Sequence, residues 1–202
     1  MFLTYIGHNG WITSLTVGQD ANNYPLLISG SRDRTLIVWN LDLENDEVQY
    51  DSSDKEIKKA ERKVGKPLKS LKGHSHFVST VNISKDNNFV ISSSWDRTLR
   101  LWDLTTFRTK QLFKGHTKDV LTASFAYDNR MIISGGMDKT MRIWNIKGEN
   151  KHISTDFSGW VSSLTLLKQG KENFVAVGKL NLTIILYLFF VFTYLIIIRK
   201  LG

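Results

Sequence analysis

One twelve-residue pattern occurs three times in this chain and constrains its fold more than any other feature. The three copies read SGSRDRTLIVWN (29–40), SSSWDRTLRLWD (92–103) and SGGMDKTMRIWN (134–145). A Gly-His pair stands upstream of each copy, with its histidine at His8, His74 or His116. The second and third copies are 42 positions apart, measured between their tryptophans or between their histidines. A period of about 40–45 residues with a Gly-His start and a Trp-Asp end is the signature of a propeller blade.

Each repeat contains four short segments with the residue pattern of β-strands. The segments TLIVW, TLRLW and TMRIW are rich in β-branched and aromatic residues and are bounded by turn residues. The segments WITSLTV, FVSTVNI and DVLTASF alternate apolar with small or polar residues, which indicates one buried face. With LLIS, FVIS or MIIS between them and an outer strand such as KSLKGH or KQLFKGH, each unit is predicted to be a four-stranded antiparallel blade. The predicted fold class is therefore all-β.

The spacing divides residues 1–187 into blades and one insertion. Blades are predicted at about 7–43, 67–104 and 110–147, with a degenerate fourth blade at about 152–187. Trp39 and Trp102 are 63 positions apart, and the excess falls in the charged stretch 44–66, which is predicted to be an inserted loop. The mixed charges of this stretch favour a solvated loop, with RNA contact as the less favoured alternative.

The fourth repeat keeps the spacing of the others but loses their polar residues. Tyr187 lies 43 positions after Trp144, in register with the earlier tryptophans. Phe157, Val177 and Asn181 stand where the other repeats have His, Ser and Asp. The fourth blade is therefore expected to be the least secure of the four.

An apolar tail, 188–202, follows the fourth repeat, and 19 uncharged residues separate Lys179 from Arg199. Three interpretations are open. The stretch has the length of a membrane span, and the Arg-Lys after it suits a cytoplasmic flank, so the first is a membrane anchor. The second is a strand over 181–187 with an irregular apolar strand beyond it. The third is a translated intron or frameshift, which we favour for the origin of the tail, with the strands as its conformation.

Each of the three repeats contains a His, a Ser and an Asp, which a nucleophilic triad would also contain. Three equivalent copies argue against catalysis, because an enzyme needs a single oriented site. A turn carboxylate can instead accept from the imidazole, which reaches the Ser hydroxyl, which meets the Trp indole N–H. Such a network would satisfy buried polar groups and hold the Gly-His loop against the strand turn. The predicted structural tetrads are His8, Ser29, Asp33 and Trp39; His74, Ser92, Asp96 and Trp102; and His116, Ser134, Asp138 and Trp144.

Composition limits the chemistry and the partners. The 202 residues contain no cysteine, so we predict no disulfide and no thiolate metal site, and the five histidines are too scattered to indicate a metal cluster. No phosphate-cradling Gly loop is evident, so no cofactor is predicted, and the repeated triads argue against a catalytic residue. The N-terminus lacks the basic and apolar regions of a secretory signal. The net charge of +8 favours an anionic partner such as RNA or an acidic membrane, with a merely solvated basic surface as an equal alternative.

Only the first repeat places a cation on each side of its turn carboxylate. Arg32 and Arg34 flank Asp33, whereas the later copies read Trp-Asp-Arg and Met-Asp-Lys. Guanidinium groups suit phosphate, and two close together can bridge adjacent phosphates. An ordinary exposed turn is the alternative, and the residues alone favour it slightly.

The repeats resemble the WD40 propeller family, and within it the receptors for activated C kinase, also called guanine nucleotide-binding protein β-subunit-like proteins. The resemblance runs from about Thr4 to Gly178 and rests on motifs such as GHNGWITSLT, SSSWDRTLRLWDL and MDKTMRIWNIKG. Members of this family are seven-bladed scaffolds of the small ribosomal subunit. The resemblance therefore implies a truncated propeller of about four blades, open or incompletely closed, with an exposed strand edge and an apolar blade face.

The same resemblance implies a non-enzymatic, cytoplasmic, ribosome-associated scaffold that also binds protein kinases and translation regulators. In this family the first-blade turn faces ribosomal RNA, which assigns RNA contact to Arg32 and Arg34. Lys72, Lys114 and Lys118, near the Gly-His loops, are predicted to extend that face. Contact with the phosphate backbone would be salt-sensitive, and base readout is not expected, because the sequence shows no RNP-type aromatic platform. A membrane-tethered WD40 interaction module and a non-functional fragment are the alternatives.

Overall fold

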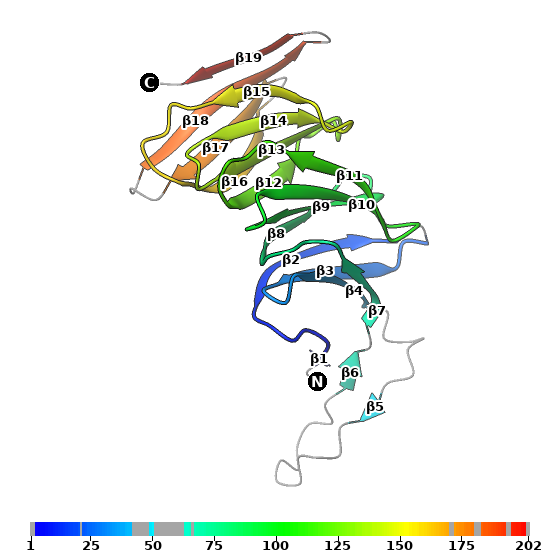
Figure 1. The fold of residues 1–202 in the computed structure, drawn as a ribbon. Helices are drawn as coiled ribbons and strands as arrows, with labels where there is room; N and C mark the ends of the chain where they lie inside the picture. The colour runs from blue at the N-terminus through cyan, green and yellow to red at the C-terminus, as the bar shows by residue number, and fades with distance from the viewer. Residues whose placement is uncertain are drawn as a thin grey trace.

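The computed structural model describes residues 3–20, 22–41, 49–50, 63–65, 67–169, 172–179, 183–192 and 195–200. All helix or strand assignments in these ranges are β-strands. Within them, four antiparallel sheets of four strands each follow one another along the chain (Figure 1). The all-β class and the approximate number of blades predicted from the repeats are therefore confirmed.

The first two sheets contain the first two repeats. The first sheet has the order β2 (Ile12–Gln19), β3 (Pro25–Ser31), β4 (Thr35–Asn40) and β7 (Pro67–Lys72). The second sheet has the order β8 (Val78–Ile83), β9 (Phe89–Ser94), β10 (Thr98–Asp103) and β11 (Arg108–Lys114). Alternating apolar residues form the first strand of each sheet, and the tryptophan of the repeat lies in the third strand.

The third and fourth sheets repeat this arrangement. The third sheet has the order β12 (Val120–Phe125), β13 (Met131–Gly136), β14 (Met141–Asn145) and β15 (Asn150–Ser154). The fourth has the order β16 (Val161–Gln169), β17 (Glu172–Lys179), β18 (Thr183–Phe192) and β19 (Leu195–Lys200). The degenerate fourth repeat therefore still forms a four-stranded sheet.

Three short strands form a separate small sheet near the N-terminus. β1 (Leu3–Tyr5) pairs in parallel with β6 (Lys63–Gly65), and β5 (Gln49–Tyr50) pairs antiparallel with β6. β5 and β6 both belong to the predicted insertion 44–66. The other residues of that insertion lie outside the described residues.

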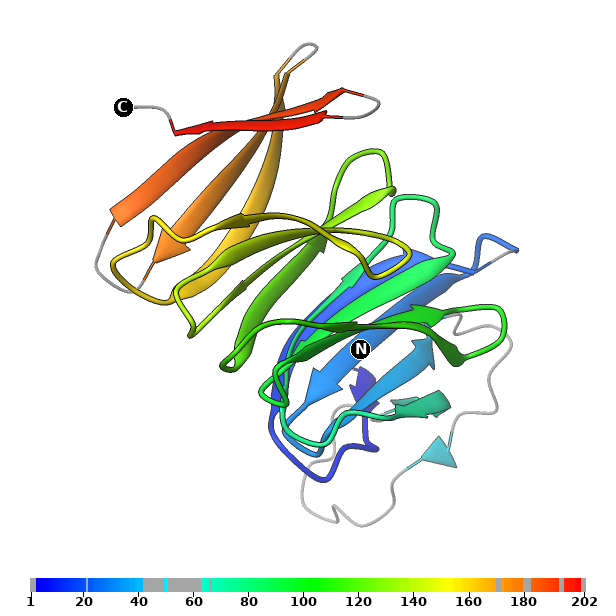
Figure 2. The ribbon, with the colours of Figure 1, turned by 45° about the horizontal axis from the view of Figure 1, so that its top comes forward.

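The four large sheets stand side by side, and their first strands lie next to one another. β8 contacts β2 on one side and β12 on the other, and β12 also contacts β16. Figures 1 and 2 show the first and fourth sheets at opposite ends of a curved array, so the sheets do not close into a ring. The expected open propeller is therefore confirmed.

Apolar cores fill the spaces between neighbouring sheets. The first core includes Leu36 of β4 and Val78 of β8, and the second includes Leu99 of β10 and Ile132 of β13. The third core joins Ile143 of the third sheet to the strands of the fourth. Because the two middle sheets bury both faces, their second strands read as short continuous apolar runs.

Neighbouring sheets approach closely because a small residue stands on the second strand. A Cβ added at Gly30 of β3 would lie 2.8 Å from the side chains of Val78 and Val81 in β8. A Cβ at Gly135 of β13 would collide with Val161 of β16 in the same way. These two glycines therefore set the distance between consecutive sheets.

The sheets differ from the predicted blade boundaries by one strand. β7, β11 and β15 lie at the starts of the predicted second, third and fourth blades, but each pairs with the tryptophan strand of the preceding repeat. Thr35 of β4 lies opposite Lys72, and Thr98 of β10 lies opposite Lys114. The chain leaves each tryptophan strand through a turn or the insertion and returns along its outer edge. The sequence repeat is therefore offset from the sheet.

The apolar stretch after Lys179 forms two strands where the structure describes it. β18 runs without a break past residue 187, the predicted end of the fourth blade, because its pairing with β17 continues as far as Phe189. β19 then pairs antiparallel with β18 inside the predicted tail 188–202. In the described part of the chain, no helix has both the length and the apolar character needed to cross a membrane. The intron or frameshift origin of the tail stays a prediction.

Strand β2 has an exposed apolar face, as expected for an open array. Ile12, Leu15 and Val17 are 54%, 58% and 61% exposed. Leu15 and Val17 alternate with Ser14 and Gly18, whose positions contact β8. No other large sheet of the described chain covers this face.

The close approach of consecutive sheets makes a first prediction. We expect Gly135→Ala to lower the free energy of unfolding by about 1–3 kcal/mol, because the added methyl group overpacks the contact with Val161. Gly178→Ala is the matched control, since it changes the same position of the fourth sheet and its Cβ would lie 3.4 Å from the nearest neighbour. Urea unfolding of both variants tests this. Equal losses of stability would contradict the role assigned to Gly135.

Candidate functional site

A chain of hydrogen bonds joins the four residues of the first predicted tetrad. The indole N–H of Trp39 donates to the hydroxyl of Ser29 at 2.8 Å. That hydroxyl lies 2.7 Å from Nε2 of His8, whose Nδ1 lies 2.7 Å from a carboxylate oxygen of Asp33. Since an ionised carboxylate only accepts, Nδ1 carries the proton. The chain of bonds ties the buried tryptophan strand to the Gly-His loop at the surface.

The second and third tetrads have the same geometry. The indole N–H to Ser distance is 2.8 Å in both, and so is the distance from Ser to His. The distances from His to Asp are 2.7 and 2.8 Å. The serines and tryptophans are buried in all three tetrads. The structure therefore brings together every residue of the three predicted tetrads: His74, Ser92, Asp96, Trp102, His116, Ser134, Asp138 and Trp144 in the second and third, with the four described above.

The surroundings of the turn carboxylates keep them ionised. Burial raises the pKa of Asp96, but the hydrogen bond and charge of His74, with the hydrogen bonds of Thr98 and Ser75, bring the pKa well below its usual range. The pKa of Asp138 is lowered in the same way by His116, Thr140 and Thr117, against the opposing effect of burial. The ionised carboxylates hold the Gly-His loops in place by accepting from their backbone N–H groups.

The turns that contain these carboxylates place a cation at a left-handed position. Arg34, Arg97 and Lys139 have φ angles of 70°, 69° and 62°. The left-handed region is costly for long side chains and is usually occupied by glycine. In each turn the side chain of the residue after the Asp is exposed. Arg97 and Lys139 were not among the predicted contact residues. Their position directly after the Asp, which matches that of Arg34, is the sequence signal that could have identified them.

All five cations predicted to contact RNA are exposed, and they lie at one end of the sheets. Arg32 and Arg34 belong to the β3–β4 turn. Lys72 is the last residue of β7 and lies opposite Thr35, the first residue of β4. Lys114 ends β11, and Lys118 follows His116 in the next Gly-His loop. Lys72 therefore lies in the first sheet beside Arg34, while Lys114 lies in the second sheet beside Arg97. We call this end of the sheets the loop face.

The carboxylate between the two arginines does not neutralise them. Asp33 accepts from Asn9 and His8 at one oxygen and from the backbone and hydroxyl of Thr35 at the other. Within the part of the chain that the structure describes, neither Arg32 nor Arg34 forms an ion pair. Both guanidinium groups are thus available to an anionic ligand.

Sequence reasoning missed an aromatic group beside Arg32. The guanidinium carbon of Arg32 lies 4.5 Å from the ring centre of Trp11 and 5.4 Å from that of Phe77. Trp11 and Phe77 each follow the histidine of their repeat by three positions, which is the signal that could have identified them. The loop face therefore carries aromatic rings as well as cations.

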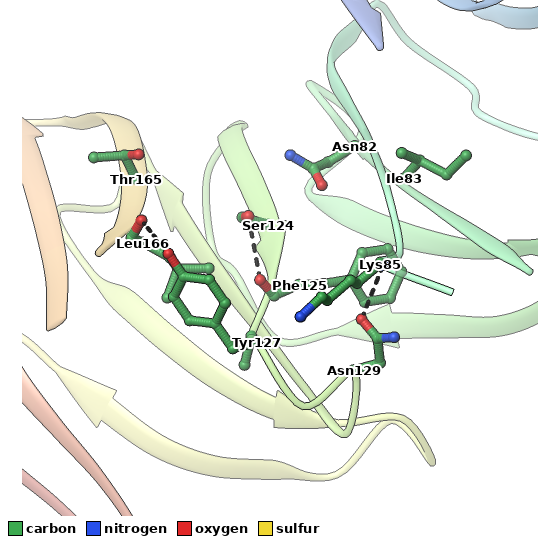
Figure 3. A pocket seen from close by; sticks show the side chains of 10 residues that line it. Asn82, Ile83, Lys85, Ser124, Phe125, Tyr127, Asn129, Thr165 and Leu166 are labelled. Carbon is green, nitrogen blue, oxygen red and sulfur yellow. Dashed lines mark hydrogen bonds between the residues drawn. The ribbon is translucent and has the colours of Figure 1, made fainter. Parts of the chain in front are cut away.

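A shallow groove of about 430 Å³ lies at the opposite end of the sheets. Figure 3 shows Asn82, Ser124 and Thr165 around it, with Lys85 beside the turn that carries Asn129. The backbone N–H of Lys85 donates to the Asn129 side chain at 3.1 Å. These residues come from the C-terminal ends of β8 and β12 and from β16, whereas the loop face adjoins the N-terminal ends of those strands. The groove is therefore separate from the predicted site.

Comparison with known families places the chain among WD40 proteins. The family model for the WD domain, G-beta repeat, matches residues 2–40, 65–103 and 107–145, which together are more than half of the chain. The chain therefore belongs to the WD40 repeat family.

Within this family, the chain is similar to ribosomal proteins. It is 48% identical over 99 residues to the small ribosomal subunit protein RACK1 of Candida albicans and 45% identical over 99 residues to that of Drosophila melanogaster. It is also 48% identical over 99 residues to the MST50-interacting protein 11 of Pyricularia oryzae. Each match covers 49% of this chain and 26% of the relative. The chain thus matches about a quarter of the length of these curated relatives.

The tetrad geometry makes a second prediction. We expect Ser134→Ala to lower the free energy of unfolding by about 1–3 kcal/mol, because it leaves the buried N–H of Trp144 and Nε2 of His116 without their partner. Ser124→Ala is the control, since this half-buried hydroxyl of the same sheet makes only a 3.4 Å bond to a backbone carbonyl. Urea unfolding measures both, and a similar effect of the two changes would argue against a structural role for the tetrad.

The lowered pKa of the turn carboxylates makes a third prediction. Because the unfolded chain then binds more protons than the folded chain, stability is lost as the pH falls below about 4. Asp138→Asn removes one of these titrating groups, so the variant should be less stable at neutral pH and lose less stability on acidification. Urea unfolding between neutral pH and pH 3 provides the comparison. An unchanged acid dependence would show that Asp138 does not couple to folding.

Proposed function

We propose that this chain is a non-enzymatic scaffold that docks on the small ribosomal subunit through its loop face. The observation that carries the proposal is the β3–β4 turn, in which Arg32 and Arg34 are exposed and form no ion pair within the described residues, while Asp33 is saturated by its own loop. Two guanidinium groups held two residues apart suit adjacent phosphates of an RNA backbone. The relatives named as small ribosomal subunit proteins support the choice of RNA as the ligand.

The remaining cations of the loop face widen the proposed contact. Lys72 extends it beside Arg34, and Lys114, Lys118 and Arg97 extend it across the second and third sheets. Because these groups would neutralise phosphates and release counterions, binding should weaken steeply as salt rises. Such contacts set position and orientation and do not select a base sequence.

The three tetrads serve structure in this proposal. Each holds a Gly-His loop against a turn, and the three sites are equivalent in geometry, which is the arrangement expected of a repeated structural device. A scaffold attached to the ribosome in the cytoplasm would leave its other surfaces free for protein kinases and translation regulators. We include these protein partners in the proposal because the family that the sequence resembles binds them.

Charge reversal on the loop face tests the proposal. We expect the double variant Arg32→Glu and Arg34→Glu to lose co-sedimentation with small ribosomal subunits on sucrose gradients at moderate salt, with an unchanged urea midpoint. Arg130→Glu with Lys147→Glu is the matched control, because these exposed cations lie in turns at the opposite end of the third sheet. Undiminished co-sedimentation of the loop-face variant, or equal loss in the control, would refute the proposed site.

A further inference from the structure

A backbone hydrogen bond joins the same two positions in each of the first three repeats. The residue before the turn Asp donates its N–H to the residue three positions after the His. These bonds run from Arg32 to Trp11 at 2.9 Å, from Trp95 to Phe77 at 3.0 Å, and from Met137 to Asp119 at 2.9 Å. The fold therefore places one pair of side chains side by side on the loop face of each repeat, and the sequence decides their chemistry.

In the first two repeats these pairs join into one continuous run of contacts. Arg32 lies over Trp11 and also over Phe77 of the next repeat, at 4.5 and 5.4 Å from the ring centres. Phe77 lies 5.5 Å from Trp95, and the imidazole of His76 stacks on Trp95 at 5.8 Å with an interplanar angle of 14°. We call the five residues Trp11, Arg32, Phe77, Trp95 and His76 the aromatic ladder.

The aromatic ladder lies at the surface and outside the three cores. Trp11 is 73% exposed, His76 and Arg32 are also exposed, and Phe77 and Trp95 are half-buried. The ladder ends at the third repeat, where Asp119 and Met137 occupy the same pair of positions. An exposed run of rings restricted to the first two repeats is not needed to build the sheets, because the third sheet forms without it.

Exposed cations share the loop face with the ladder. Arg34 and Arg97 directly follow the Asp of its two turns, and Lys72 lies opposite Thr35 at the end of β7. The two carboxylates of its turns, Asp33 and Asp96, are occupied by hydrogen bonds from their own loops. A ligand of this surface must therefore combine flat apolar faces with negative charge at short intervals.

We propose that the rings of the aromatic ladder stack unpaired bases of single-stranded RNA while Arg32 and the neighbouring cations hold the phosphates on either side. This inference deepens the proposed function and rests on it, because it assumes that the loop face binds RNA. Bases free of a duplex present both faces to aromatic rings and guanidinium planes, whereas duplex bases are stacked on each other. The sequence predicts no base readout, because it shows no RNP-type aromatic platform, and the proposed stacking needs none, since every base presents a flat face to a ring.

The experiment compares two RNA probes on the full chain. Fluorescence anisotropy would measure the affinity for a single-stranded adenosine oligonucleotide and for a blunt RNA duplex of equal length at the same salt concentration. We expect tighter binding of the single strand, and about a tenfold loss of that affinity in Trp11→Ala with little change for the duplex. Trp11→Phe, which keeps a ring, should retain most of the affinity.

Trp160→Ala is the matched control, because Trp160 follows a glycine in the same loop position of the fourth repeat and is 42% exposed. It should bind both probes as the parent chain does. If Trp11→Ala binds the single strand normally while Arg32→Glu with Arg34→Glu loses RNA, base stacking is overturned and the proposed function stands. If both variants bind RNA normally, both proposals fail. Loss of subunit binding without loss of RNA affinity would assign the ladder to a protein contact and overturn this inference.

Discussion

The hydrogen-bond chain from tryptophan through serine and histidine to aspartate is the interaction on which the rest of the structure depends. In the first repeat it begins at Trp39 inside the sheet and ends at Asp33 in a surface turn, and two further copies repeat it. A polar chain of this kind is stabilising only when every member is satisfied, and here each donor and acceptor along the chain has a partner. The same carboxylate closes its own turn through Thr35, and the next residue, Arg34, adopts a left-handed conformation with its side chain exposed.

Much of this arrangement could be predicted from the sequence, because the same residue pattern occurs three times. The Trp-Asp period predicted the four-stranded sheets, and the recurrence of His, Ser and Asp predicted which side chains lie together. The pairing of β7 with β4 was missed, since a repeat fixes the order of strands along the chain but not the sheet that each strand joins. The contact of Arg32 with Phe77 was missed because it joins two repeats, and no local pattern reports the distance between loops of neighbouring sheets.

The loop face combines buried residues that fix its loops with exposed residues that can contact a ligand. The tetrads and the glycines between sheets fix the loops, and the residues that those loops expose are free to vary from repeat to repeat. At these positions the first repeat has two arginines and a tryptophan, the second has Phe77 and Trp95, and the third has Asp119 and Met137. The loops of the loop face therefore share one backbone arrangement but carry different side chains in each sheet. Basic and aromatic side chains are concentrated in the first two sheets.

The most direct test is a cryo-electron microscopy map of the chain bound to the small ribosomal subunit. We expect the β3–β4 turn to lie against RNA, with both guanidinium groups at phosphates and the indole of Trp11 against an unpaired base. The three tetrads should remain closed in the complex. A map in which the chain is attached through the groove near Lys85, with Arg32 and Arg34 in solvent, would contradict this expectation.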